Sequence, residues 1–505
     1  MSSQQWGSRA GFILAAVGSA IGLGNIWRFP YMAFDNGGGA FLIPYFFALL
    51  TAGIPIMILE FSFGHRMKGG APLAFARLRR SWEWLGWWQV LVSFVIAVYY
   101  VAVIGWAISY IGYGFTQAWG DAPVAFFTES YLGMTDRALE LGGLRLHVLI
   151  PILVAWGVTL AALLGGVRRG IEIANKIFMP VLIVMLLVIL VRGVTLPGAV
   201  AGLNLLFQPD FGSILDASVW VDAYGQIFFT LSIAFGIMLT YSSYLPRKSD
   251  LINNGFMTAL LNAGFSILSG IAVFSIIGFM MGQAGGELPE NLDGVMLAFV
   301  TIPTAISQLP TLNVLIGVLF FVSLTIAGLS SLISINEVVV RSLVDKLNAP
   351  RRPVIIVYIL IAAGISVIFA TGAGLAFVDI VDHFINNFGI VMTGLIEVLL
   401  LGWLVRLNDF REHANELSDF AIGGWWNFMI KIVTPLVLGV TAVQNLIQDL
   451  TGAYGDYEVL ALVTLGWSLV VLTLIGAFVL SFARWGNPDM LRGGTEHENG
   501  EGGTR

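Results

Sequence analysis

Twelve runs of about 20 apolar residues dominate this sequence, and each is long enough for one helix to cross a lipid bilayer. They cover residues 11–35, 39–63, 86–114, 146–165, 172–192, 217–244, 255–282, 311–343, 353–371, 376–404, 424–447 and 458–483. Only 11% of the residues are charged and the mean hydropathy is +0.86, whereas a soluble domain has about 25% charged residues. The sequence therefore predicts an all-α polytopic membrane protein with about twelve transmembrane helices and excludes a soluble enzyme.

Lysine and arginine are unevenly distributed between the segments that join these runs. With the N-terminus placed inside, the inner segments hold 21 of the 25 basic residues and the outer segments hold three, while Arg28 lies within the first run. Because basic residues favour the cytoplasmic side of a membrane, we expect both termini in the cytoplasm. The absence of cysteine fits the inner membrane of a bacterium, and residues 487–505 have the composition of a disordered cytoplasmic tail.

The first run contains helix-weakening residues at its centre. Gly18, Gly22 and Gly24 fall within seven positions, and each glycine weakens a helix by about 1 kcal/mol. Small residues also line helix interfaces in membranes, so the glycines alone do not decide between close packing and a break. The amide of Asn25 and the guanidinium of Arg28 favour a break, because both need partners that lipid does not provide.

The sixth run repeats this pattern with Gln226, Thr230 and Ser232 near its centre. Interrupted runs at positions one and six predict two inverted repeats of five helices, about 11–192 and 217–404, with two further helices at about 424–483. One transporter domain would then span residues 1–486. A break at the centre of the membrane frees carbonyl groups for a cation and directs a half-helix N-terminus at an anion.

Further polar side chains within the runs indicate an oxygen-rich interior. Asn262 and Ser266 lie one helical turn apart, and Ser330 and Ser331 are adjacent. Hard cations such as sodium prefer these oxygen ligands. Five scattered histidines with no metal-binding spacing argue against an enzyme, and the net charge of −6 offers no basic surface to nucleic acid.

Five short segments resemble the neurotransmitter:sodium symporter family. They are residues 20–31 (AIGLGNIWRFPY), 36–41 (NGGGAF), 170–172 (GIE), 225–232 (GQIFFTLS) and 327–331 (AGLSS). The resemblance runs from about Trp6 to Trp485 and is greatest to bacterial amino-acid members. It implies the leucine transporter fold, with a 5+5 inverted repeat and broken helices one and six.

The resemblance implies three ion sites. The first sodium would bind the substrate carboxylate together with Ala20, Asn25, Thr230 and Asn262. The second sodium would bind carbonyl or hydroxyl oxygens of Gly18, Ile21, Ala327, Ser330 and Ser331. Chloride would bind Tyr45, Gln226, Thr230, Asn262 and Ser266. Many bacterial relatives place a carboxylate where Ser266 stands, so the serine predicts chloride dependence.

The resemblance also implies a substrate pocket. Its lining would be Ser19, Ala20, Gly22, Leu23, Gly24, Ile96, Tyr100, Phe229, Thr230, Ser232, Phe235, Ser331 and Ile335. Monoamine-transporting members carry aspartate where Gly22 stands, so the glycine leaves room for a substrate carboxylate. The mostly apolar lining favours sodium-coupled import of a neutral, hydrophobic amino acid by alternating access. Taurine or a β- or γ-amino acid stays open as the substrate, and an ion-gated channel or an amino-acid sensor stays open as the function.

Two gates complete what the resemblance implies. The outer gate would pair Arg28 with Asp382, and the inner gate would use Trp6, Tyr244 and Asp345. Ser3 stands where the family usually has an inner-gate arginine. We therefore expect either weaker inward closure or a replacement of that arginine by Arg9 or another cation.

Overall fold

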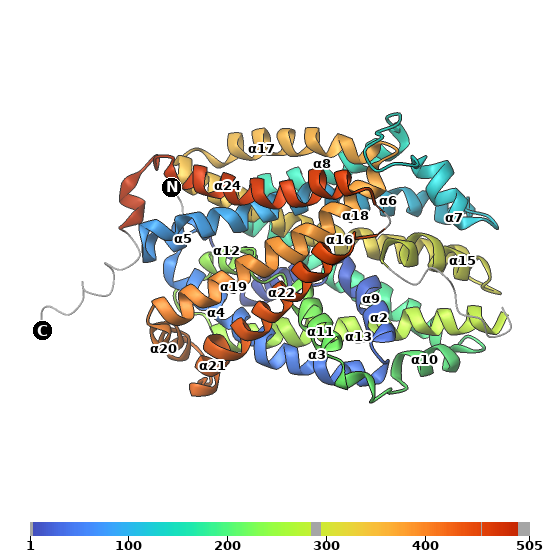
Figure 1. Ribbon diagram of the computed structural model, residues 1–505, viewed down its shortest axis with the longest axis horizontal. Helices are drawn as coiled ribbons and strands as arrows, with labels where there is room; N and C mark the ends of the chain where they lie inside the picture. Colours follow the sequence, from blue (N-terminus) through green and yellow to red (C-terminus); the bar gives the residue numbers. More distant parts are fainter. Residues whose placement is uncertain (1–3, 284–293, 456, 493–505) are drawn as a thin grey trace, which may run out of the picture.

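The protein is an elongated bundle of helices that run roughly parallel to its long axis (Figure 1). The computed structural model describes residues 4–283, 294–455 and 457–492. Within these residues the regular structure is helical, and the only extended pairing is an isolated bridge between Gly38 and Pro209. The architecture agrees with the predicted all-α polytopic membrane protein.

Each of the twelve predicted spans corresponds to one or two of the helices described. In chain order, these are α1 Arg9–Ala20 with α2 Phe29–Asp35, α3 Leu42–Ala48 with α4 Ile54–Met67, α6 Glu83–Thr116, α8 Leu146–Leu164, α9 Glu172–Val194, α11 Ala217–Thr230 with α12 Ile237–Ser243, α13 Leu251–Gln283, α16 Asn313–Leu347, α17 Arg351–Ser366, α18 Gly374–Phe384 with α19 Val391–Leu399, α21 Gly424–Phe428 with α22 Thr434–Thr451, and α23 Val459–Ala461 with α24 Ser468–Phe482. Among the residues described, ten helical stretches are long and apolar enough to cross a membrane, and the bent first span makes an eleventh. The sixth span consists of two shorter helices.

Short helices cover the two ends of the bundle. At one end lie α5 Ala71–Leu78 and α20 Leu407–Leu417, on the left of Figure 1, beside the point where the chain enters and leaves the bundle. We call this end the terminal face. At the opposite end, the vestibule face, lie α7 Pro123–Ala125, α10 Ala199–Phe207, α14 Gly294–Met296 and α15 Ile302–Ser307.

The spans differ in how much of their surface the protein buries. In the most apolar part of the span containing α6, 83% of residues are buried, against 22% in the spans of α22 and α24. The outer helices expose large apolar side chains such as Leu450 and Phe482. This pattern suits outer helices that face lipid around a protein-packed centre, because lipid chains are as apolar as those side chains.

Two spans are broken near their middle, as their polar and glycine-rich sequences predict. The first bends by 57° between Arg9–Ala20 and Gly24–Asp35. The sixth is helical to Thr230 and resumes at Ile237. Between these points, Ser232 and Ala234 have positive φ angles of 54° and 73°. Such strain in residues other than glycine is typical of functional sites.

The C-terminal end of the last span is fastened to the terminal face through a buried carboxylate. Glu83, fully buried at the start of α6, accepts hydrogen bonds from Nε1 of Trp87 (2.9 Å) and Nε1 of Trp485 (2.9 Å). It also accepts one from Nζ of Lys346, at 2.5 Å. The start of α6, the end of α16 and the segment after α24 therefore meet at one acid.

The segment after Trp485 continues along α5. Pro488–Leu491 form a short 3₁₀ helix, and the Met490 carbonyl accepts a hydrogen bond from Arg77. Met490 also packs against the small apolar cluster of Leu73, Ala76 and Trp485. Residues 488–491 belong to the segment that we expected to be disordered, and the rest of that segment from 493 on lies outside the described residues.

Candidate substrate and ion site

The two broken spans touch each other at their breaks. The Ser19 carbonyl, at the end of α1, accepts hydrogen bonds from the hydroxyls of Ser232 (2.9 Å) and Ser331 (3.1 Å). Ser232 lies in the unwound part of the sixth span, and Ser331 lies in α16. A carbonyl that the helix does not use therefore joins three spans at the centre of the bundle.

Side chains from three neighbouring spans satisfy the unwound backbone of the sixth span. The Ala234 amide donates to Glu60 of α4 (2.6 Å), and the Ala234 carbonyl accepts from Thr393 of α19 (2.9 Å). Ser93 of α6 donates to the Phe235 carbonyl (2.9 Å). Irregular backbone at membrane depth requires such protein partners, since lipid offers none.

All thirteen predicted substrate-binding residues line one small cavity between the breaks. They are Ser19, Ala20, Gly22, Leu23, Gly24, Ile96, Tyr100, Phe229, Thr230, Ser232, Phe235, Ser331 and Ile335. The cavity also contacts Asn25, Tyr99, Asn386 and Ile390, none of which is in the predicted substrate lining. Asn25 was predicted as a ligand of the first sodium, and the other three were not predicted for any site. Its free volume is about 40 Å³, which is room for roughly three water molecules. The tyrosine pair at 99–100 and the asparagine pair at 386–387, each within an apolar run, are the sequence signals that could have indicated Tyr99 and Asn386.

Asn25 is the centre of a buried polar cluster that contains the side chains predicted for the first sodium. Its Nδ2 lies 2.8 Å from each of three oxygens, Oγ1 of Thr230, Oδ1 of Asn262 and Oγ of Ser266. An amide nitrogen has two hydrogens, so three acceptors exceed what it can satisfy. Its Oδ1 accepts from the Gly22 amide (2.9 Å). A concentration of neutral oxygens of this kind suits a hard cation.

The residues predicted for the second sodium also lie together. Ser331 Oγ is 3.5 Å from the Ile21 carbonyl oxygen, and Ser330 donates to the Ala327 carbonyl (2.8 Å). The Gly22 amide donates to Asn25 rather than to the Gly18 carbonyl. The Gly18 carbonyl therefore lacks the hydrogen bond that a continuous helix would give it. The donor set therefore consists of backbone and hydroxyl oxygens, as an alkali cation prefers.

The predicted chloride ligands are placed next to the Asn25 cluster. Thr230, Asn262 and Ser266 belong to that cluster, as described above. The Tyr45 hydroxyl and both polar atoms of the Gln226 amide are fully buried without a partner of normal hydrogen-bond geometry among the described residues. Tyr45 faces Ser266. Buried donors without acceptors fit an anion, because leaving them unsatisfied is unfavourable.

A wider vestibule of about 510 Å³ adjoins this cavity and is also lined by α14 at the vestibule face. Arg28 and Asp382 both line it, but the described residues show no ion pair between them. The Arg28 guanidinium lies 4.7 Å from the centre of the Phe229 ring, and Asp382 accepts a hydrogen bond from Tyr99 (2.6 Å). The predicted outer gate is therefore unpaired in this conformation, and its two members lie along an open vestibule.

The terminal face is closed by packed aromatic residues and buried ion pairs. Trp6 is buried and donates from Nε1 to the Tyr241 carbonyl (2.8 Å). Tyr244 donates to Glu337 (2.6 Å), which also accepts two hydrogen bonds from Arg351 at 2.5 and 2.8 Å. One of the two states of an alternating-access transporter is closed at one face and open at the other. This structure is closed at the terminal face and has an open vestibule at the opposite face.

Asp345, the predicted inner-gate carboxylate, pairs with a cation other than the proposed replacement Arg9. It accepts from Nε of Arg341 (2.9 Å) and from the Gly70 amide (2.8 Å). Arg9, which we expected as a possible replacement, pairs instead with Asp250 at 3.2 Å. Position 3 lies outside the described residues. The cation beside Asp345 thus comes from the preceding turn of α16.

Lys68, just beyond α4, joins the loop before α5 to the segment after α12. Its ammonium donates to the Leu245 carbonyl (2.7 Å). Burial, with a smaller contribution from Arg247, lowers the pKa of Lys68 to about 8. The amine is therefore held in a poorly hydrated place at the terminal face.

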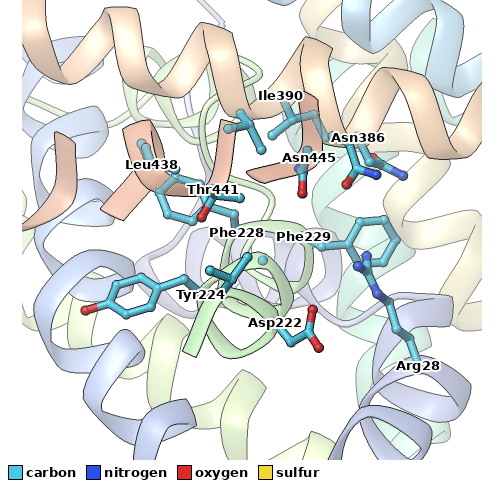
Figure 2. A pocket seen from close by; sticks show the side chains of 14 residues that line it. Arg28, Asp222, Tyr224, Phe228, Phe229, Asn386, Ile390, Leu438, Thr441 and Asn445 are labelled. Atoms are coloured by element: carbon cyan, nitrogen blue, oxygen red, sulfur yellow. The ribbon is translucent and has the colours of Figure 1, made fainter. Parts of the chain in front are cut away.

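A side cavity lies beside the substrate cavity, between α11, α22 and the π-helical turn Ile385–Ile390 that joins α18 to α19 (Figure 2). Figure 2 shows Thr441 and Asn386 above it, and Asp222 and Arg28 below it. Phe229, Asn386 and Ile390 line both cavities. These shared residues form the partition between the two spaces.

Gly22 is the position where added bulk should most directly obstruct the substrate cavity. A Cβ there would lie 2.9 Å from Ser331 Oγ and 3.0 Å from the Tyr100 hydroxyl. Overpacking of this kind costs about 1–3 kcal/mol, so we expect Gly22→Ala to weaken substrate binding by roughly tenfold to a hundredfold. Gly264→Ala, where a Cβ would meet nothing within 4 Å, is the control for a glycine change in a helix. Equal substrate affinity of both variants in a binding titration would contradict the placement of Gly22.

Two broken helices that bring an oxygen-rich cluster and a small cavity to the centre of a helical membrane bundle are typical of a secondary transporter. The family model described as the sodium:neurotransmitter symporter family matches residues 3–123 and 120–487. The chain therefore belongs to that family, as its motifs predicted, and is a sodium-dependent transporter rather than an enzyme.

Curated relatives align over nearly the whole chain. An uncharacterized sodium-dependent transporter of Methanocaldococcus jannaschii is 41% identical over 95% of this chain and 98% of that protein. The sodium- and chloride-dependent taurine transporter of Homo sapiens is 28% identical, covering 94% of this chain and 83% of the relative. The mouse sodium- and chloride-dependent GABA transporter 2 is also 28% identical, over 94% and 85% of the two chains.

Proposed function

We propose that this transporter couples the entry of sodium to the import of a neutral amino acid by alternating access. The observation that carries the proposal is the convergence of the thirteen predicted lining residues on one cavity next to the Asn25 cluster. In this arrangement a substrate carboxylate entering the cavity meets a sodium ion held by Asn25, Thr230 and Asn262. Because ion and carboxylate would share one contact, each stabilises the same conformation as the other.

A second sodium, in this proposal, binds between α1 and α16 at the oxygens of Gly18, Ile21, Ala327, Ser330 and Ser331. It would hold the first span against α16 while the terminal face is closed. Two sodium ions with a tenfold gradient and 100 mV across the membrane supply about 7 kcal/mol. That is sufficient for accumulation of a zwitterion by about five orders of magnitude.

We place the terminal face in the cytoplasm and the protein in the cell membrane. The 21 basic residues of the inner segments support this orientation. The open vestibule would then face outward, so that solute and sodium enter from outside.

A related small zwitterion is the second candidate substrate. The names of the taurine and GABA transporters among the relatives favour it. Gly22 and the small cavity fit the carboxylate or sulfonate of such a solute as well as that of an α-amino acid.

Uptake by the purified protein in liposomes tests the transport proposal. An inward sodium gradient should drive accumulation of at least one neutral amino acid or small zwitterion above equilibrium, and an inside-negative potential should increase it. Accumulation that ignores the sodium gradient, or sodium currents without solute uptake, would contradict the symporter and favour a channel.

We further propose that chloride binds among Tyr45, Gln226, Thr230, Asn262 and Ser266. The unpartnered donors of Tyr45 and Gln226 support it. An anion would offset the charge of two sodium ions, which a poorly hydrated interior otherwise disfavours.

Replacing chloride with gluconate should reduce uptake by the wild type by about tenfold. Ser266→Glu should transport equally well in both salts, because its carboxylate supplies the negative charge. Ser275→Glu, at a buried serine elsewhere on α13, is the control for an added carboxylate. Wild-type uptake that is the same in gluconate would refute the chloride site.

A further inference from the structure

The substrate cavity is walled mainly by hydrocarbon. Ile96, Phe229, Phe235, Ile335 and Ile390 all line it. The backbone of the two breaks supplies the polar groups suited to an ammonium and a carboxylate. Eight polar side chains also line the cavity, and two of them, Ser19 and Asn386, have buried polar atoms without a hydrogen-bond partner of normal geometry among the described residues. A hydrophobic solute side chain would leave these two groups unsatisfied.

Ser19 is the first of these side chains. It is 1% exposed, and its Oγ has no hydrogen-bond partner among the described residues. Its carbonyl uses the hydroxyl hydrogens of Ser232 and Ser331, so neither hydrogen is available to Ser19 Oγ. This hydroxyl keeps its hydrogen and both lone pairs for a solute in the cavity.

Asn386 is the second, and it reaches the cavity from the turn between α18 and α19. Both polar atoms of its amide are buried without a partner of normal geometry in the described part of the chain. It faces Tyr99, whose hydroxyl hydrogen is already donated to Asp382 (2.6 Å). The adjacent Asn387 differs, because its amide contacts His383 Nδ1 at 3.1 Å. Figure 2 shows Asn386 directed toward Phe229, at the partition between the two cavities.

Native proteins rarely leave buried polar atoms unsatisfied. A solute with a hydrocarbon side chain would bury Ser19 Oγ and the Asn386 amide without giving either a partner. A site that contains such groups rejects analogues that lack the matching hydroxyl or amide far more strongly than a hydrophobic pocket rejects an added hydroxyl.

We infer that the transported solute is a small polar neutral amino acid, in the size range of serine, threonine and asparagine, whose side-chain hydroxyl or carboxamide binds Ser19 and Asn386. This inference rests on the proposed sodium-coupled uptake and narrows its substrate from neutral amino acids in general to small polar ones. It differs from the expectation of a hydrophobic side chain, which followed from the apolar part of the lining.

Matched pairs of amino acids test the inference on the wild-type protein. Threonine and valine have the same shape and differ in a hydroxyl, and asparagine and leucine differ mainly in a carboxamide. Sodium-dependent binding, measured by displacement of a radiolabelled amino acid or by thermal shift, should favour threonine over valine and asparagine over leucine by at least about tenfold. Valine or leucine binding as tightly as its polar partner would overturn the inference, as would tighter binding of taurine or γ-aminobutyrate than of every α-amino acid.

Two variants then connect the preference to the named side chains. Ser19→Ala should reduce the threonine-to-valine ratio toward one, and Asn386→Leu should do the same for asparagine and leucine. Ser269→Ala is the control for Ser19, because Ser269 is also a buried serine with an unpartnered hydroxyl but does not line the substrate cavity. Unchanged ratios in both binding-site variants would overturn the assignment.

Different results would refute the proposed sodium-coupled transport and the proposed polar substrate. If no amino acid or zwitterion binds in a sodium-dependent manner, the proposed function itself is wrong. If sodium-dependent binding persists but apolar amino acids are preferred, sodium-coupled transport stands and only the polar substrate is refuted.

Discussion

Asn25→Ala should abolish sodium-driven uptake while leaving a folded protein. The side chain holds four contacts, from Nδ2 to Thr230, Asn262 and Ser266 and from Oδ1 to the Gly22 amide. Its loss removes a proposed sodium ligand and leaves several buried polar groups unsatisfied, at about 1–3 kcal/mol for each. We expect sodium affinity to fall by about a hundredfold or more.

The measurement is the sodium dependence of uptake in liposomes, together with sodium-induced thermal stabilisation. Asn336→Ala is the control, because Asn336 is also fully buried but contacts Leu332 and Tyr358, away from the substrate cavity. It should retain the sodium response even if its melting temperature falls. Uptake by Asn25→Ala vesicles as fast as by the parent, with the same response to sodium, would refute the shared ion and carboxylate site.

Glu337→Gln should open the terminal face. Glu337 is fully buried and accepts hydrogen bonds from Tyr244 and, twice, from Arg351, so it joins the end of α12 to α16 and α17. Removing one partner of a buried ion pair costs about 3–5 kcal/mol, because the other charge is left uncompensated. The closed state should therefore lose much of its population.

The chain contains no cysteine, so one introduced cysteine reports accessibility without background. A cysteine at Ser243, which is 7% exposed beside Tyr244, should react with a water-soluble maleimide at least about tenfold faster in Glu337→Gln than in the parent. Glu412→Gln, at an exposed position on α20, is the control. An unchanged labelling rate would show that the ion pair stabilises the fold without controlling closure.

Local patterns in the sequence predicted the spans and the two breaks well. Apolar runs identify spans because membrane helices must be apolar for their whole length. The breaks were visible because glycines and polar side chains are unfavourable in a lipid-facing helix. The unwound segment itself, Leu231 to Gly236, begins later than the polar cluster suggested, because Gln226 and Thr230 are accommodated within helix α11.

Pairings between distant parts of the chain had no such signal. His65 and His413 approach to 2.9 Å across 348 positions, and Glu60 contacts a backbone amide 174 positions away. The sequence around each of these residues gives no indication of its partner. The predicted pairing of Arg28 with Asp382 stays a prediction. An outer gate closes in only part of a transport cycle, and the sequence does not encode which state a structure represents.

The polar lining of the cavity could be predicted from the sequence only in part. Ser19 was among the expected lining residues, but its unsatisfied hydroxyl became evident only when the partners of its neighbours were known. Asn386 was missed because an asparagine in the tenth apolar run has many possible orientations. The distribution of hydrogen-bond partners, rather than residue type, is the basis for proposing a polar substrate over a hydrophobic one.

The hydrogen bond from Trp485 to Glu83 has a consequence for biosynthesis. Glu83 is made early, yet one of its indole partners lies 402 positions later, beyond the last span. Until the ribosome has released that tryptophan, the acid at the start of α6 lacks part of its hydrogen-bonding shell. Chains truncated before residue 485 should therefore carry a buried carboxylate that is paired with Lys346 but lacks one of its hydrogen-bond donors.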